Sequence, residues 1–171
     1  MSVYVKISTP GPPVLDRPLY FAMNSEPVPA QRFNILLIDD NHGDAQLFQT
    51  AMQEVAPRVS IYWLATAAEG LEALARRERF KHVAGFDIAV LDLNMSPSDG
   101  FETIQAMRNE EKSAFIPIVV MSNSRDQSDI NRAYRCGANS YIVKPMTLQG
   151  TLDAAAAMAR YWLEIASLPR E

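Results

Sequence analysis

The sequence predicts a doubly wound α/β fold, in which five helices flank a five-stranded parallel sheet. Two observations lead to this fold class. Short apolar runs without polar alternation indicate strands that are buried on both faces, and segments with helical spacing of apolar residues follow each of them. From residue 33 onward this alternation repeats five times. Right-handed crossovers between parallel strands leave few other arrangements for such a pattern.

The strands are predicted where apolar and β-branched residues run together. In chain order these segments are Ile35 to Ile38, Val59 to Leu64, Ile88 to Leu91, Ile116 to Met121 and Tyr141 to Val143. These segments are three to six residues long, which is an ordinary length for a strand.

The helices are predicted between and after these strands from spacing and end signals. They run from about Gly43 to Val55, from Thr66 through Leu74, from near Gly100 through Met107, from Gln127 to Arg135, and from Leu148 to Ile165. Thr66 with Glu69 forms a capping-box pattern, and Asp99 precedes the third helix as a candidate cap. Gly137 is placed to end the fourth helix.

The first 32 residues differ in composition from the rest. Six of the eleven prolines fall in this segment, a density that blocks regular helices and ladders. We therefore divide the chain into a proline-rich N-terminal arm, residues 1–32, and a folded domain, residues 33–171. Val3 to Ile7 remains open as a short edge strand within an ordered arm.

Composition limits the classes of function. The 171 residues are 48% hydrophobic, carry a formal net charge of -4 and contain no basic tract, which argues against nucleic acid as a partner. No apolar run approaches the ~20 residues that span a bilayer, so we expect no membrane insertion. The single cysteine, Cys136, and the lack of a secretory pattern favour a cytoplasmic protein. Surplus apolar residues on the last helix favour a homodimer.

Polar residues collect at the carboxyl ends of the predicted strands. Asp39 and Asp40 follow the first strand, Asp92 the third, Ser122 the fourth, and Lys144-Pro145 the fifth. In doubly wound sheets the ligand site lies at this edge, where the winding reverses. Converging carboxylates favour a hard divalent cation such as Mg²⁺, and the ammonium with the hydroxyl suits an anion such as a phosphoryl group.

With these residues in place, the chain from about Phe33 resembles the receiver domain of two-component response regulators. Asp39-Asp40 resembles the acidic pair, Asp92 the phosphoacceptor, Ser122 and Tyr141 the hydroxyl and aromatic switch residues, and Lys144-Pro145 the Lys-Pro pair. Their spacings, 30 residues from Asp92 to Ser122 and 22 from Ser122 to Lys144, also suit that family. The segments Asp39 to Phe48 and Tyr161 to Pro169 resemble the single-domain regulators of the cyanobacterial-phytochrome type.

The resemblance implies a flavodoxin-like sheet of order 2-1-3-4-5 and transfer of a phosphoryl group to Asp92 from a histidine kinase, with phytochrome-type kinases as the first candidates. It implies Mg²⁺ held by Asp40, Asp92 and the backbone carbonyl of Asn94, with Asp39 acting through water. Asn94 is also expected to face the water that attacks in autodephosphorylation.

The output is expected from the face of the fourth helix, fifth strand and fifth helix, since no output domain follows. Lys144-Pro145 is a candidate cis peptide, because proline reduces the trans preference to about 0.5 to 1 kcal/mol.

One departure from the family pattern lies in the loop after Asp92. Ser96 stands where many receivers have proline, and Pro97 follows it, so we expect an altered loop with the site retained. Two other functions stay open. A magnesium-dependent aspartyl-phosphate phosphohydrolase would use the same nucleophile, although Asn94 replaces its usual second aspartate. A phosphorylation-independent binding module would not need the acidic pair or Lys144.

Overall fold

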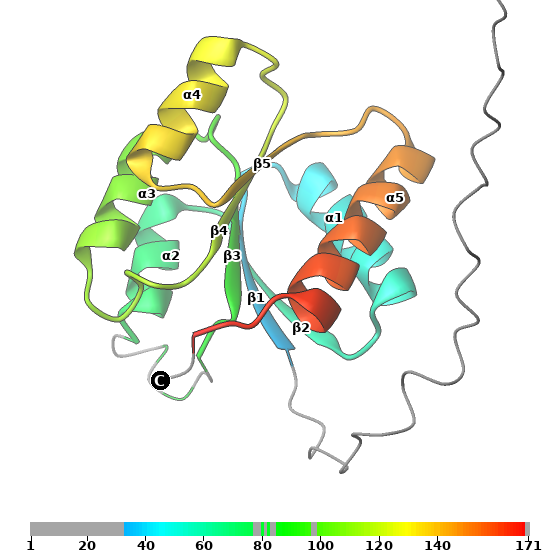
Figure 1. Cartoon of the computed structure of the whole chain (residues 1–171), viewed down its shortest axis with the longest axis horizontal. Helices are drawn as coiled ribbons and strands as arrows, with labels where there is room; N and C mark the ends of the chain where they lie inside the picture. Colours follow the sequence, from blue (N-terminus) through cyan, green and yellow to red (C-terminus); the bar gives the residue numbers. More distant parts are fainter. Residues whose placement is uncertain (1–32, 77–79, 81, 83–84, 97–98, 170–171) are drawn as a thin grey trace, which may run out of the picture. The chain divides into compact units, whose positions relative to one another are not determined.

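The computed structural model describes residues 33–76, 80, 82, 85–96 and 99–169 (Figure 1). These residues form a five-stranded sheet of order β2-β1-β3-β4-β5, and every neighbouring pair is parallel. The predicted fold class and strand order are confirmed. Winding reverses between β1 and β3, which pair directly, so the carboxyl ends of these two strands meet at the switch point of the sheet.

The strands and helices follow the predicted order. The strands are β1 (Phe33–Ile38), β2 (Val59–Leu64), β3 (Ile88–Leu91), β4 (Ile118–Ser122) and β5 (Ser140–Val143). The helices are α1 (His42–Val55), α2 (Ala67–Leu74), α3 (Gly100–Asn109), α4 (Gln127–Cys136) and α5 (Leu148–Ala159), which continues as a π-helical segment, η2 (Arg160–Ile165).

The sheet separates two apolar cores, one under each helix layer. Helices α1 and α5 cover one face, and α2, α3 and α4 cover the other (Figure 1). Along β1, Ile35 and Leu37 pack into the α1/α5 core, whereas Leu36 and Ile38 pack into the opposite core. All four are at most 2% exposed, which is why the run contains no polar alternation.

Helix and strand ends were mostly placed correctly by local signals. The side chain of Thr66 accepts a hydrogen bond from the Glu69 amide, and Asp99 accepts one from the Phe101 amide, as predicted. Gly137 ends α4 in the left-handed conformation, with a φ of 111°. The cap of α1 was not predicted: Asn41 accepts from two amides of the first turn, so the helix begins at His42.

The predicted start of the fourth strand is wrong, and the last helix differs in type. Strand β4 begins at Ile118 and not at Ile116, because the Ile116 amide donates to Ser113 in a turn and Pro117 has no amide hydrogen for a ladder. The last helix extends to Ile165 as predicted, but it is α-helical only as far as Ala159. Its final turn widens, and the Ala166 amide donates to the Tyr161 carbonyl five residues earlier.

Several predictions concern residues outside the described part of the chain. These are the N-terminal arm 1–32 with its edge strand Val3 to Ile7, and the effect of Pro97 on the loop after Asp92. Within the described residues, no helix is both long and apolar enough to cross a membrane.

Candidate functional site

Three carboxylates converge at the carboxyl ends of β1 and β3. Asp39 and Asp40 follow β1 directly, Asp92 follows β3, and the register pairs Ile38 with Leu91 immediately before them. One carboxylate oxygen from each residue lies within 4.8 Å of the others. Asp39 and Asp92 are only 4% and 5% exposed, whereas Asp40 is exposed to solvent. The predicted convergence is therefore confirmed, with two of the three charges removed from water.

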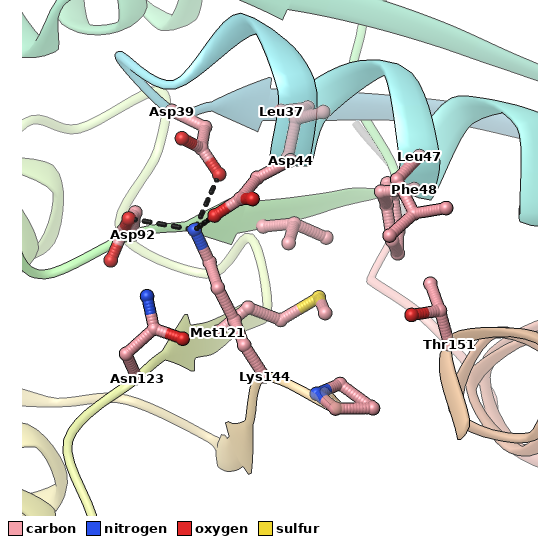
Figure 2. A pocket seen from close by; sticks show the side chains of 12 residues that line it. Leu37, Asp39, Asp44, Leu47, Phe48, Asp92, Met121, Asn123, Lys144 and Thr151 are labelled. Atoms are coloured by element: carbon pink, nitrogen blue, oxygen red, sulfur yellow. Dashed lines mark hydrogen bonds and ion pairs between the residues drawn. The ribbon is translucent and has the colours of Figure 1, made fainter. Parts of the chain in front are cut away.

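Lys144 brings an ammonium group into this cluster from the end of β5. Its Nζ lies 2.9 Å from Asp39 Oδ2, 2.8 Å from Asp92 Oδ2 and 2.7 Å from Asp44 Oδ2 (Figure 2). Burial by itself would lower the pKa of Lys144, but the hydrogen bonds that its ammonium donates to the three carboxylates outweigh burial, and the pKa is raised. The lysine therefore stays charged at neutral pH.

One lysine does not fully compensate the buried acids. Burial raises the pKa of Asp39, although the bonds from Lys144 and from the Asn41 amide act in the opposite direction. The negative charge of Asp92 raises it further. Ionised Asp39 is thus held in an environment that disfavours its charge, which is the condition that a bound cation relieves.

The loop after β3 links the Asp92 carboxylate to Ser122 at the end of β4. The Asn94 amide donates to Asp92 Oδ1 at 3.1 Å, and the Asn94 side-chain amide donates to Ser122 Oγ, also at 3.1 Å. Asn94 itself is exposed, while Ser122 is fully buried. One residue therefore contacts both the proposed acceptor and the hydroxyl group that the sequence singled out.

Gly100 fixes the return of this loop into α3. A β-carbon at this position would lie 2.5 Å from the Leu93 Cα and 2.9 Å from the Asp92 carbonyl oxygen. The loop is closed by an antiparallel bridge between Asn94 and Asp99. Any side chain at position 100 would force apart the backbone that holds Asp92.

Tyr141 lies apart from the carboxylates. Its ring packs against the α2/α3/α4 core, and its hydroxyl donates to the Ser124 carbonyl in the β4–α4 loop at 3.0 Å. The same loop contacts Ser122, whose Oγ accepts from the Ser124 amide at 3.3 Å. Tyr141 and Ser122 thus share one loop, although they do not share the acidic cluster.

Three contacts at the site were missed by the sequence reasoning. Asp44 reaches Lys144 from the first turn of α1, the Trp63 indole donates to the Asp39 carbonyl at 2.8 Å, and the Ser96 amide donates to Asp40 Oδ2 at 3.1 Å. Asp44 had a detectable signal, since the first turn of a helix that follows a strand faces the same edge of the sheet. The Trp63 and Ser96 contacts join segments that are distant in sequence, so no local sequence pattern predicts them.

A pocket opens beside the acidic cluster, toward α1 and α5 (Figure 2). Its lining joins the charged groups to the α1/α5 core and consists of Leu37, Asp39, Asp44, Leu47, Phe48, Val90, Asp92, Met121, Asn123, Lys144, Pro145 and Thr151. Pro145 therefore borders the site, and the cis geometry of the Lys144-Pro145 peptide stays a prediction.

Comparison with known proteins identifies the family. The model of the response regulator receiver domain matches residues 35–156, which include every residue of the cluster. The chain belongs to this family. The resemblance inferred from the strand-end residues is thereby confirmed.

Other proteins similar in sequence or in structure to this chain are also response regulators or regulatory proteins. The probable methanogenesis regulatory protein FilR2 of Methanothrix harundinacea is 30% identical over 134 residues, covering 77% of this chain and 84% of its own. The response regulator Rcp1 of Synechocystis is 24% identical over 79% of this chain and 92% of its own.

The phosphorylated cyanobacterial phytochrome response regulator RcpA superposes with a TM-score of 0.77 and 26% identity, over 82% of this chain and 100% of its own. The Mn²⁺-bound form of Rcp1 shares the fold, with a TM-score of 0.73, 23% identity and coverage of 81% and 99%.

Proposed function

We propose that this receiver accepts a phosphoryl group on Asp92 from the phosphohistidine of a sensor kinase. The observation that carries the proposal is the joint placement of Asp39, Asp40, Asp92 and Lys144 at one edge of the sheet, within hydrogen-bonding or metal-binding range of each other. A nucleophilic carboxylate, an acidic pair and a fixed ammonium are the groups that phosphoryl transfer to an aspartate requires. Membership of the receiver family agrees with this assignment.

The residues present fit a hard divalent cation such as Mg²⁺. Asp39, Asp40 and Asp92 offer only oxygen ligands, their oxygens are close enough to share one ion, and exposed Asp40 leaves that side open to water. We assign the ion to Asp40, Asp92 and the Asn94 carbonyl, with Asp39 acting through water. When bound, it would neutralise charge on the acidic cluster and on the transferred phosphoryl group.

The protein groups supply attack and charge balance. An Asp92 carboxylate oxygen forms the new P–O bond while the P–N bond of the phosphoimidazole breaks, and the imidazole leaves with the electron pair. The Asn94 amide, 3.1 Å from Asp92 Oδ1, orients the nucleophile. Lys144 already lies 2.8 Å from Asp92 Oδ2, so its charge is in place where negative charge develops.

Phosphorylation is proposed to act outward through Ser122 and the β4–α4 loop. New acceptor oxygens on Asp92 would take a hydrogen bond from the Ser122 hydroxyl and draw it away from its present contacts, in which Ser122 Oγ accepts from the Asn94 side chain and from the Ser124 amide. Moving Ser122 shifts the loop that Tyr141 holds through the Ser124 carbonyl. The surface of α4, β5 and α5 would then change between two packed arrangements.

The kinase is proposed to be of the phytochrome type. The support is the likeness to RcpA, a cyanobacterial phytochrome response regulator that is 26% identical over 82% of this chain. Phosphotransfer profiling against purified histidine kinases tests this step. We expect phosphoryl transfer from a phytochrome kinase to be at least as fast as transfer from unrelated kinases. A preference for an unrelated kinase would contradict this assignment.

A cytoplasmic location stays a prediction that cell fractionation checks.

A homodimer is proposed through the end of α5 and η2. Tyr161 and Ile165, four residues apart on η2, are 51% and 62% exposed, and both are large apolar side chains. Light scattering coupled to gel filtration measures the mass. The double variant Tyr161→Ser and Ile165→Ser should shift a dimer to monomer, and a monomeric native protein would rule out this surface as a dimer interface.

Phosphorylation of Asp92 is tested by incubating the full chain with acetyl phosphate and Mg²⁺ and measuring the intact mass. One phosphoryl group is expected on the native protein and none on Asp92→Asn. Asp153→Asn is the matched control, because Asp153 is exposed on α5 and accepts a hydrogen bond from the neutral side chain of Gln149. Labelling of Asp92→Asn would refute the acceptor. Continuous turnover of a phosphomonoester would favour a phosphohydrolase, and target binding unaffected by Asp92→Asn would favour a phosphorylation-independent module.

A further inference from the structure

Lys144 has no hydrogen left to offer a phosphoryl group. An ammonium carries three N–H donors, and all three are engaged by Asp39, Asp92 and Asp44 at 2.9, 2.8 and 2.7 Å (Figure 2). If Lys144 is to bind an oxygen of a phosphoryl group on Asp92, it must release one of these carboxylates. The question is which of the three it releases.

The three partners differ in what their release would cost. Asp39 and Asp92 have side chains only 5% and 6% exposed, so either one would be left buried without its cation. The Asp44 side chain is 35% exposed, and water can replace the lysine there. Asp44 also lies outside the group of three carboxylates that converge for a metal ion. It is therefore the partner that Lys144 gives up most readily.

We propose that Asp44 is a positioning residue that competes with the phosphoryl group for Lys144 and is displaced when Asp92 is phosphorylated. The inference rests on the proposed function, since it concerns the same acceptor. Asp44 lowers the affinity of the site for a phosphoryl group in two ways: it occupies one donor of Lys144, and it adds a negative charge beside the incoming dianion. Phosphorylation then frees Asp44, in the first turn of α1, from its ion pair with Lys144.

A purely structural role for Asp44 makes a different prediction. A carboxylate in the first turn of α1 stabilises the helix through its dipole, and Asp44→Asn would weaken that interaction. Such a variant would be less stable, but its affinity for a phosphoryl mimic would stay the same or fall. The competition model predicts that the affinity rises.

The test is titration of the full chain with beryllofluoride, a phosphoryl mimic, at saturating Mg²⁺, followed by calorimetry. Asp44→Asn should bind it about threefold or more tightly than the native protein, the range expected for release of a part-exposed ion pair. Affinity for Mg²⁺ alone, without beryllofluoride, should change much less. Asp44→Glu, which keeps the carboxylate, should stay closer to the native protein than Asp44→Asn.

Glu54→Gln is the matched control, because Glu54 is an exposed acid at the other end of the same helix. It removes an equal charge and should leave beryllofluoride affinity unchanged. Equal or weaker binding by Asp44→Asn would overturn the inference while leaving the acceptor role of Asp92 intact, as would an equal gain in Glu54→Gln. If the native protein binds no beryllofluoride and takes no phosphoryl group from acetyl phosphate, the proposed function fails and this inference fails with it.

Discussion

Removing the ammonium of Lys144 should destabilise the protein strongly in the absence of a divalent cation. Lys144 is 9% exposed and is the cation paired with Asp39 and Asp92, which are 4% and 5% exposed. Lys144→Met keeps an unbranched apolar side chain of similar length but removes the ammonium, so two buried carboxylates lose their cation. Breaking a buried ion pair in this way costs about 3 to 5 kcal/mol. We expect the lower figure, about 3 kcal/mol, because exposed Asp40 and half-exposed Asp44 let water reach one side of the cluster.

Mg²⁺ should restore part of this loss. An ion that binds only the folded state stabilises it by about 2.7 kcal/mol when its concentration is one hundred times the dissociation constant. The variant has four carboxylates and no lysine at the site, so it should bind the ion more tightly than the native protein does. Stabilisation by Mg²⁺ should therefore be larger in Lys144→Met than in the native protein.

The measurement is urea unfolding at pH 7, in EDTA and in MgCl₂, followed by circular dichroism. Lys112→Met is the control, since Lys112 is exposed and donates a hydrogen bond to a neutral backbone carbonyl; the effect of this substitution should stay within about 0.5 kcal/mol. A Lys144→Met variant within 1 kcal/mol of the native protein in EDTA would contradict the assigned role of the ion pairs. Equal stabilisation of both proteins by Mg²⁺ would contradict the predicted coupling.

Three further predictions use the same unfolding assay. Burial raises the pKa of Asp39, so the ionised carboxylate destabilises the folded state at pH values above the pKa of the unfolded chain. Asp39→Asn removes this ionisation and should raise the urea midpoint at pH 7 in EDTA. The gain should shrink as the pH falls, because Asp39 of the native protein then becomes protonated. Gly100→Ala should lower the free energy of unfolding by about 2 kcal/mol or more, because the new β-carbon would clash with backbone atoms. Gly43→Ala should lower it less, because its β-carbon would meet only a side-chain atom. Arg108 donates five hydrogen bonds to carbonyl oxygens, so Arg108→Lys should destabilise nearly as much as Arg108→Met; full rescue by lysine would refute this geometry.

The parts of the fold that could be predicted from sequence depend on local chemistry. Continuous apolar runs revealed strands buried on both faces, and the end signals at Thr66, Asp99 and Gly137 act within a few residues of the helix that they limit. The site was predictable for the same reason: a charge that ends a buried strand must lie at the carboxyl edge, where Asp39 and Asp92 are indeed found together.

What the sequence did not reveal depends on contacts between distant segments or on small changes of helix geometry. The π-helical turn at Arg160–Ile165 contains no glycine or proline, the residues that mark helix irregularities in a sequence, so its composition does not distinguish it from an α-helical end. Asp44 reads as an ordinary first-turn acid until the position of Lys144, 100 residues later, is known. The hydrogen bond from Trp63 to the Asp39 carbonyl likewise requires the pairing of β2 with β1.

The charge balance of the site indicates an order of events. Among the residues that the structure describes, four carboxylates surround the one ammonium of Lys144, and they belong to Asp39, Asp40, Asp44 and Asp92. The site before modification therefore repels a phosphoryl dianion and attracts a cation. Burial strengthens that imbalance, as the raised pKa of Asp39 indicates. Binding of a divalent ion should therefore precede phosphoryl transfer, and release of Asp44 by Lys144 should follow it. On this reasoning, the excess of acid keeps the resting site closed to phosphoryl groups until a cation is bound.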